Sequence, residues 1–137
     1  MTAHHLILHT DGGARGNPGP AAIGVVIKAG GQIIATISRT IGVTTNNQAE
    51  YQAVAAGLEY ARGVGADQVD VYCDSELVVH QLRGKYKVKH RDLGPWVVRI
   101  HSLANQIGRV TYSAVPREAN RGADALVNRA LDAASGI

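Results

Sequence analysis

The sequence has a single cysteine, Cys73, so no disulfide bond can form within the chain. One cysteine agrees with a reducing compartment or with indifference to redox conditions. Long apolar runs are also missing: the N-terminus has only three consecutive strongly apolar residues, and no later run approaches membrane-spanning length. We therefore expect no signal peptide, no membrane partner and a cytoplasmic location.

Low-complexity tracts and internal repeats are absent as well. A length of 137 residues is typical of one domain that buries its own core. We expect a single domain over residues 1–137. No apolar stripe is left unexplained by the predicted core, which favours a monomer.

Acidic residues are scarce in the second part of the sequence. Residues 1–82 carry four Lys or Arg against seven Asp or Glu, whereas residues 83–137 carry ten against four. The segment RGKYKVKHR has a cationic residue at every second position, including Lys85, Lys87 and Lys89. Such a segment is suited to a nucleic-acid backbone, although a solvated surface loop has the same composition.

Glycine and proline are concentrated in the stretch HTDGGARGNPGPAAIG. After Asp11 it has five glycines and two prolines within thirteen residues. Glycine permits a close approach to the main chain, and proline fixes φ. The stretch therefore predicts a loop shaped for a turn or for a ligand that comes near the backbone.

Hydrophobic periodicity predicts five strands and four helices. Strands are expected at 5–10, 22–29, 32–41, 68–74 and 109–115, and helices at 48–65, at 75–82, at 92–107 and from near 122 onward. The order is βββαβααβα. A strand meander followed by alternating helices and strands predicts an α/β domain with a mixed sheet flanked by helices.

Four carboxylates stand out by their positions. Asp11 and Asp74 each end a predicted strand, Glu50 lies in the first turn of a predicted helix on its apolar side, and Asp124 opens the last helix. In open α/β sheets ligands gather outside the carboxyl ends of strands, so the two strand-end aspartates face one crevice. Four like charges in one crevice require a cation.

Each of these acids also has an ordinary structural explanation. The helix dipole favours an acid in a first turn, and an Asp before Gly is a frequent turn residue. Asp74, which comes just before Ser75, has a position from which it can help to cap the helix that follows. Only the cluster as a whole needs a ligand, and acids without His or Cys partners favour hard cations, above all Mg²⁺. Together with the basic half, a two-metal site indicates phosphodiester hydrolysis.

Four segments resemble, in order and along essentially the whole chain, the sequence blocks of type 1 ribonucleases H. They are TDGGARGNPGPAAIGVVI, TTNNQAEYQAVAAGL, VDVYCDSELVVHQLRGKYKVK and VPREANRGADALVNRAL. The resemblance implies a ribonuclease H-like five-stranded mixed sheet flanked by helices, and cleavage of the RNA strand of RNA/DNA hybrids. It implies two Mg²⁺ ions, with Mn²⁺ as an expected substitute, held by catalytic ligands that fall on Asp11, Glu50, Asp74 and Asp124. A two-metal displacement would leave 5′-phosphate and 3′-hydroxyl ends.

The resemblance also implies where the substrate lies. The glycine-rich loop is expected along the RNA strand, and the TNNQAE turn at the minor groove, where 2′-hydroxyl groups distinguish RNA from DNA. The expected contacts are Gly12, Gly13, Asn17, Asn47 and Gln48. Thr45 and Asn46 of the same turn serve either the substrate or the start of the helix.

Two departures from the family pattern concern the substrate-binding residues. The segment PREANRGAD lacks the histidine that many bacterial members carry before the last aspartate, and we expect Arg117 to be its closest functional substitute. The basic handle is short, and its expected substrate contacts are Lys85, Lys87 and Lys89. Two other functions remain open. A hybrid-binding module without catalysis is disfavoured by the four retained acids, and a DNA-cleaving nuclease or integrase of the same fold is disfavoured by the expected contacts with RNA.

Overall fold

The computed structural model describes residues 4–84 and 92–136. The strands are β1 (His5–Ala14), β2 (Gly19–Ala29), β3 (Gln32–Thr44), β4 (Gln68–Cys73) and β5 (Arg109–Ala114). The helices are α1 (Asn46–Gly63), α2 (Glu76–Leu82), α3 (Gly94–Ile107) and α4 (Arg121–Ala134), with a short 3-10 helix, η1 (Arg117–Asn120), before α4. Apart from η1, this is the predicted order of elements.

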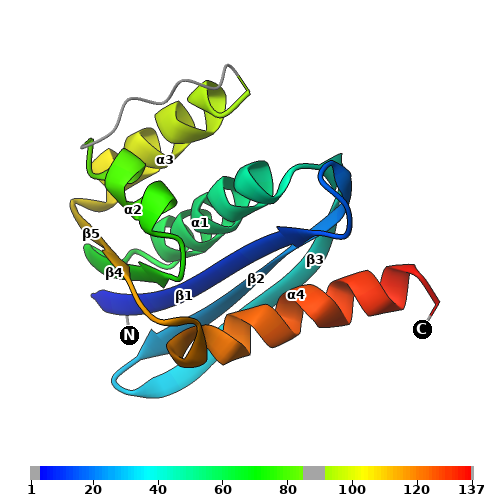
Figure 1. Cartoon of the computed structure of the whole chain (residues 1–137). Helices are drawn as coiled ribbons and strands as arrows, with labels where there is room; N and C mark the ends of the chain where they lie inside the picture. Colours follow the sequence, from blue (N-terminus) through cyan, green and yellow to red (C-terminus); the bar gives the residue numbers. More distant parts are fainter. Residues whose placement is uncertain (1–3, 85–91, 137) are drawn as a thin grey trace.

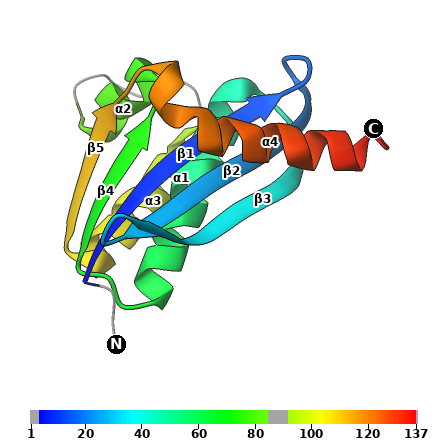
Figure 2. The ribbon, with the colours of Figure 1, turned by 90° about the horizontal axis from the view of Figure 1, so that it is seen from below.

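The five strands form one mixed sheet in the order β3-β2-β1-β4-β5. The pairs β1–β2 and β2–β3 are antiparallel, while β1–β4 and β4–β5 are parallel. Helices α1, α2 and α3 cover one face of the sheet, and α4 runs across the other face over β1, β2 and β3 (Figures 1 and 2). The predicted five-stranded, helix-flanked sheet is confirmed.

Several predicted boundaries differ from the structure: β2 begins at Gly19, β3 ends at Thr44, and Asp74 falls just beyond β4. Two further corrections change the setting of a carboxylate. Strand β1 continues to Ala14 because Gly12 and Gly13 still pair with β2, so Asp11 lies inside a strand and does not end it. Helix α1 begins at Asn46, so Glu50 is the fifth helical residue and lies beyond the first turn.

The core lies mainly between the sheet and α1. Leu6 and Leu8 of β1 are fully buried on that side, together with Tyr51 and Leu58 of α1. Helix α1 is buried on most of its surface, since α3 packs on its outer side. On the other face a smaller cluster joins α4 to β2, through Ala22, Val127, Ala130 and Leu131. No helix in the described part of the chain is long and apolar enough to span a bilayer.

Two glycines let helices approach the central strands closely, one on each face of the sheet. A Cβ atom on Gly12 would lie 2.2 Å from the carbonyl oxygen of Ala49 in α1. A Cβ atom on Gly24, which pairs with Asp11, would lie 2.2 Å from the carbonyl oxygen of Ala123 in α4. Both obstacles are backbone atoms, so neither glycine can be replaced unless a helix moves.

We expect Gly24→Ala to lower the free energy of unfolding by about 2 kcal/mol or more, because the added methyl group forces α4 away from the sheet. Gly63→Ala is the matched control, since a Cβ atom at the end of α1 would meet nothing within 4 Å. It should be neutral or stabilise the protein by up to about 1 kcal/mol. Urea unfolding of both variants measures the difference, and equal stabilities would contradict the packing described for Gly24.

Candidate metal centre

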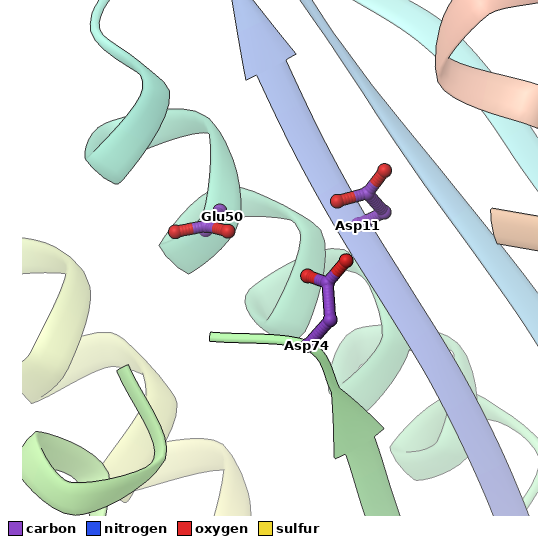
Figure 3. A group of neighbouring side chains, drawn as sticks. All are labelled: Asp11, Glu50 and Asp74. Carbon is purple, nitrogen blue, oxygen red and sulfur yellow. The ribbon is translucent and has the colours of Figure 1, made fainter. Parts of the chain in front are cut away.

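Three carboxylates from three different elements converge at one edge of the molecule. Asp11 lies on β1, Asp74 directly follows β4, and Glu50 comes from α1 (Figure 3). One carboxylate oxygen of each lies within 4.8 Å of the others. The structure thus brings together three of the four acids that the sequence singles out.

The convergence follows from the end of the β1–β4 pairing. The last residues that pair are His9 and Tyr72, so β1 continues past the end of β4. Asp11 and Asp74 each lie two residues further along the chain than this last pair, Asp11 still within β1 and Asp74 just after β4. On the α1 side, Gly12 leaves room for the backbone between Ala49 and Glu50, and the Glu50 side chain therefore reaches the same opening.

Asp124 reaches this opening from α4, on the opposite face of the sheet. It lines a cavity of about 300 Å³ together with Asp11, Glu50 and Asp74. Asp124 also interacts with Asp11: it forms a side-chain hydrogen bond with the Asp11 carboxyl group, and its charge raises the pKa of that group. The fourth acid predicted from the sequence is therefore at the same site, although it stands outside the tight group of three.

The crowding of acids is visible in the pKa of Asp11, which is raised to about 7. Burial is the largest cause, and the charges of Asp74 and Asp124 add to it. The backbone N–H of Gly12 acts in the opposite direction by hydrogen bonding to the carboxylate. Burial and the neighbouring charges therefore favour the protonated form of Asp11 as long as no cation is bound.

The pKa of Glu50 is raised further, to about 8. Burial is again the main cause, followed by the charges of Asp11 and Asp74, while a hydrogen bond from the Ser75 hydroxyl lowers it. The neutral, protonated form of Glu50 is thus favoured as well. Because the donor atoms are all carboxylate oxygens, the set fits a hard divalent cation such as Mg²⁺.

A second cavity, of about 330 Å³, lies beside the acidic one and is lined mainly by polar side chains. The structure brings to it three of the expected substrate contacts: Asn17, Asn47 and Gln48. We call this cavity the amide groove; its other lining residues are Thr45, Asn46, Asp92 and Leu93. Asn46 lines both cavities, so the amide groove and the acidic cavity are neighbours.

Thr45 and Asn46 both serve the fold at the start of α1. The Thr45 hydroxyl accepts a hydrogen bond from the Gln48 N–H at 3.2 Å, which is the geometry of a helix N-cap. The Asn46 side-chain oxygen accepts from the Ala14 N–H at 2.7 Å, and the Asn46 N–H donates to Asn17 Oδ1 at 3.1 Å. These two bonds fasten the end of β1 and the glycine-rich loop to α1.

The other predicted contacts have different surroundings. Gly12 and Gly13 both line the acidic cavity. Gly12 is nevertheless buried, because α1 packs closely against it. Arg117 lies at the mouth of the acidic cavity with its side chain 88% exposed and Nε 3.8 Å from Asp74 Oδ2. The basic contacts Lys85, Lys87 and Lys89 lie outside the described residues.

Three polar residues at the site were missed at the level of sequence. The Ser75 hydroxyl accepts from the Val78 N–H as the N-cap of α2, and it also contacts Glu50. Asn128 donates to Asp124 at 3.5 Å from one helical turn away. Asn120 is buried beside β1. Of these three contacts, only that of Asn128 could have been found in the sequence, because Asn128 lies four residues after Asp124 in a predicted helix.

Comparison with known proteins identifies the family. A family model described as reverse transcriptase-like matches residues 9–130. The bifunctional protein Rv2228c of Mycobacterium tuberculosis is 45% identical over 132 residues, which cover 95% of this chain and 36% of that protein. Ribonuclease HI of Halobacterium salinarum is 46% identical over 89% of this chain and 62% of that protein. A ribonuclease H of Verminephrobacter eiseniae is 34% identical over 94% of this chain and 92% of that protein.

Solved structures give the same result. The N-terminal ribonuclease H domain of Rv2228c, a fusion with maltose-binding protein, has a TM-score of 0.90 and 44% identity over 93% of this chain and 99% of that chain. LC11-RNase H1, solved in complex with an RNA/DNA hybrid, has a TM-score of 0.89 and 44% identity over 94% of this chain and 98% of that chain. This chain spans about a third of the length of the mycobacterial relatives. The matched residues and the shared fold together show that the chain belongs to the type 1 ribonuclease H family.

Proposed function

We propose that this chain is a metal-dependent endonuclease that cleaves the RNA strand of RNA/DNA hybrids. The observation that carries the proposal is the convergence of three carboxylates within 4.8 Å of one another, with Asp124 on the same cavity. The neighbouring amide groove supports a nucleic-acid substrate. LC11-RNase H1, which shares the fold at 44% identity, was solved with such a hybrid. We propose that residues 1–137 act as one domain and as a monomer.

The proposed metal ligands are Asp11, Glu50, Asp74 and Asp124, which would hold two Mg²⁺ ions or, as a substitute, Mn²⁺. Bound ions of this kind generate a nucleophile from water and stabilise the leaving oxygen of an in-line displacement. The products would be 5′-phosphate and 3′-hydroxyl ends. Ser75 orients Glu50, and Asn128 orients Asp124, through the hydrogen bonds described above.

Substrate recognition is proposed for the amide groove. Asn17 Oδ1 is occupied by the Asn46 N–H, so the Asn17 side chain presents its NH₂ group as a donor for the RNA strand. The Asn47 amide can donate to and accept from a 2′-hydroxyl group, whereas Gln48 Oε1 accepts from the Thr44 hydroxyl, so Gln48 likewise offers its NH₂ group. Because Asn46 borders both cavities, one strand would cross the groove and reach the carboxylates.

The remaining proposed contacts act on the phosphate backbone. The main chain of Gly12 and Gly13 borders the acidic cavity, where a phosphate would approach. Arg117 stands at the mouth of that cavity with an exposed guanidinium group, which suits a positive partner for substrate or product. The segment with Lys85, Lys87 and Lys89 is proposed to add sequence-independent affinity.

Asp11→Asn should abolish cleavage of a labelled RNA/DNA hybrid in Mg²⁺, because it removes a central ligand. Hybrid binding in EDTA should be equal or stronger, because a negative charge that faces phosphate is lost. Asp70→Asn is the control: Asp70 lies on β4 but bonds to His5 and Thr111 instead of facing the cavity. It should cleave normally, and a parallel loss of binding and cleavage in Asp11→Asn would argue against a ligand role.

Metal should also change how stability depends on pH. Asp11 and Glu50 have raised pKa values, so the metal-free folded state binds more protons than the unfolded state between about pH 4 and pH 8. Their contribution to stability is full below about pH 4 and is lost as pH rises through about 7 to 8. We therefore expect stability in EDTA to fall over this range and stabilisation by Mg²⁺ to grow with pH.

Urea unfolding at several pH values, with EDTA and with Mg²⁺, measures this effect. In EDTA the Asp11→Asn variant should have a shallower dependence on pH than the unaltered protein, since one of the two titrating groups is gone. Stabilisation by Mg²⁺ that is equal at low and high pH would contradict competition between protons and metal.

The proposed recognition of RNA predicts both the product ends and the response to 2′-deoxy nucleotides. Since the 2′-hydroxyl group serves recognition and is not the nucleophile, no 2′,3′-cyclic phosphate should form. Isolated 2′-deoxy positions in the RNA strand should slow cleavage around them, and Asn47→Ala should narrow this difference. End-group analysis and cleavage mapping test both points. A cyclic phosphate would refute the mechanism, and indifference to deoxy substitution would refute the assigned role of Asn47.

A further inference from the structure

Asn120 is one of two polar residues buried in the described part of the chain, and the other is Thr10. Each is only 1% exposed. Asn120 stands at the junction where η1 ends and α4 begins. Among the described residues its Oδ1 has no hydrogen-bond partner, so the contact made by Nδ2 shows what this buried amide holds in place.

The side chain of Asn120 does not do what asparagine usually does at this position. Asn120 is the N-cap residue of α4, where an asparagine side chain normally accepts a hydrogen bond from the first turn of the helix. No such bond is formed. Instead Nδ2 donates to the main-chain oxygen of Thr10 at 2.9 Å, across 110 positions of sequence.

The carbonyl group that receives this bond is next to the acidic cavity. Thr10 precedes Asp11, and it lies one residue past the end of the β1–β4 pairing at His9. The side chain of Asn120 thus supplies a donor to a stretch of β1 that β4 no longer accompanies. The Asn120 side chain also interacts with the ring of His9, which stacks on Tyr72 of β4.

The other end of the link carries groups of the proposed site. Asp124 lies four residues after Asn120 in the first turn of α4, and Arg117 begins η1 on the other side. Asp124 meets Asp11 only if the start of α4 is held at a fixed height above β1. Gly24 permits the close approach of the helix, but a glycine cannot fix its position along the strand.

We propose that Asn120 is a positioning residue that locks the start of α4 to β1, so that Asp124 reaches Asp11 in the metal centre. The inference rests on the proposed function, because it assigns Asp124 to the metal. A purely structural role for Asn120 would be a contribution to stability without any effect on the carboxylates.

The test is a double-mutant cycle that is read by the binding of Mn²⁺ without substrate. Calorimetric titrations compare the unaltered protein, Asn120→Ala, Asp124→Asn and the double variant. Asn120→Ala should weaken Mn²⁺ binding by roughly tenfold, the size found when a group that orients a metal ligand is removed. In the Asp124→Asn background the same substitution should have almost no further effect, because the two residues act through one carboxylate.

Kinetics on a labelled hybrid give a second readout. Asn120→Ala should lower kcat by about the factor lost in Mn²⁺ affinity, with a change in KM of less than about twofold, because the amide groove is untouched. Thr111→Val is the matched control. It removes one long-range side-chain hydrogen bond, to Asp70, and should leave Mn²⁺ affinity and kcat unchanged.

Two results would overturn the positioning role of Asn120 and leave the proposed function intact. One is that Asn120→Ala melts at a lower temperature but binds Mn²⁺ and cleaves as the unaltered protein does. The other is that the losses in Asn120→Ala and Asp124→Asn simply add. If Asn120→Ala does not fold, Asn120→Ser replaces it in the cycle, since a serine hydroxyl is too short to reach Thr10. If neither variant folds, Asn120 is required for folding itself, and the proposal is overturned. Absence of Mn²⁺ binding and cleavage in the unaltered protein would instead refute the proposed function.

Discussion

The close approach of two helices to the central pair of strands is the constraint on which the site depends. Gly12 admits the backbone of α1 on one face, and Gly24 admits the backbone of α4 on the other. Because Gly24 pairs with Asp11, both approaches occur at the same level of the sheet. With larger residues at these two positions, Glu50 and Asp124 would stand back from Asp11, and the acids would belong to separate surfaces.

Bringing these acids together is unfavourable in the metal-free protein. The pKa of Asp11 is raised to about 7 and that of Glu50 to about 8, chiefly by burial and then by neighbouring carboxylates. The burial of Leu6, Leu8 and Tyr51 and the paired strands supply the stability that offsets this cost. The cost also explains the affinity that we propose for divalent ions, since a cation relieves the repulsion that the fold imposes.

The sequence allowed the order of elements, the sheet and the four acids to be predicted, because periodicity and position along the chain carry this information. It failed where contacts between distant segments decide the structure. Asp11 was placed at a strand end because glycines follow it, yet pairing with β2 carries the strand to Ala14. The contact between Asn46 and Ala14 and that between Asn120 and Thr10 each join residues that no local pattern connects.

The N-terminal part of α1 links recognition to chemistry in the proposed function. Asn47 and Gln48 line the amide groove, and Glu50 lines the acidic cavity. They lie within one turn of a single helix, so the distance between them along the axis is at most about 5 Å. In that function a helical turn of this length would set a fixed distance between the recognised sugars and the phosphate that is attacked. Selectivity for RNA should therefore reside in the nucleotides next to the cleaved bond.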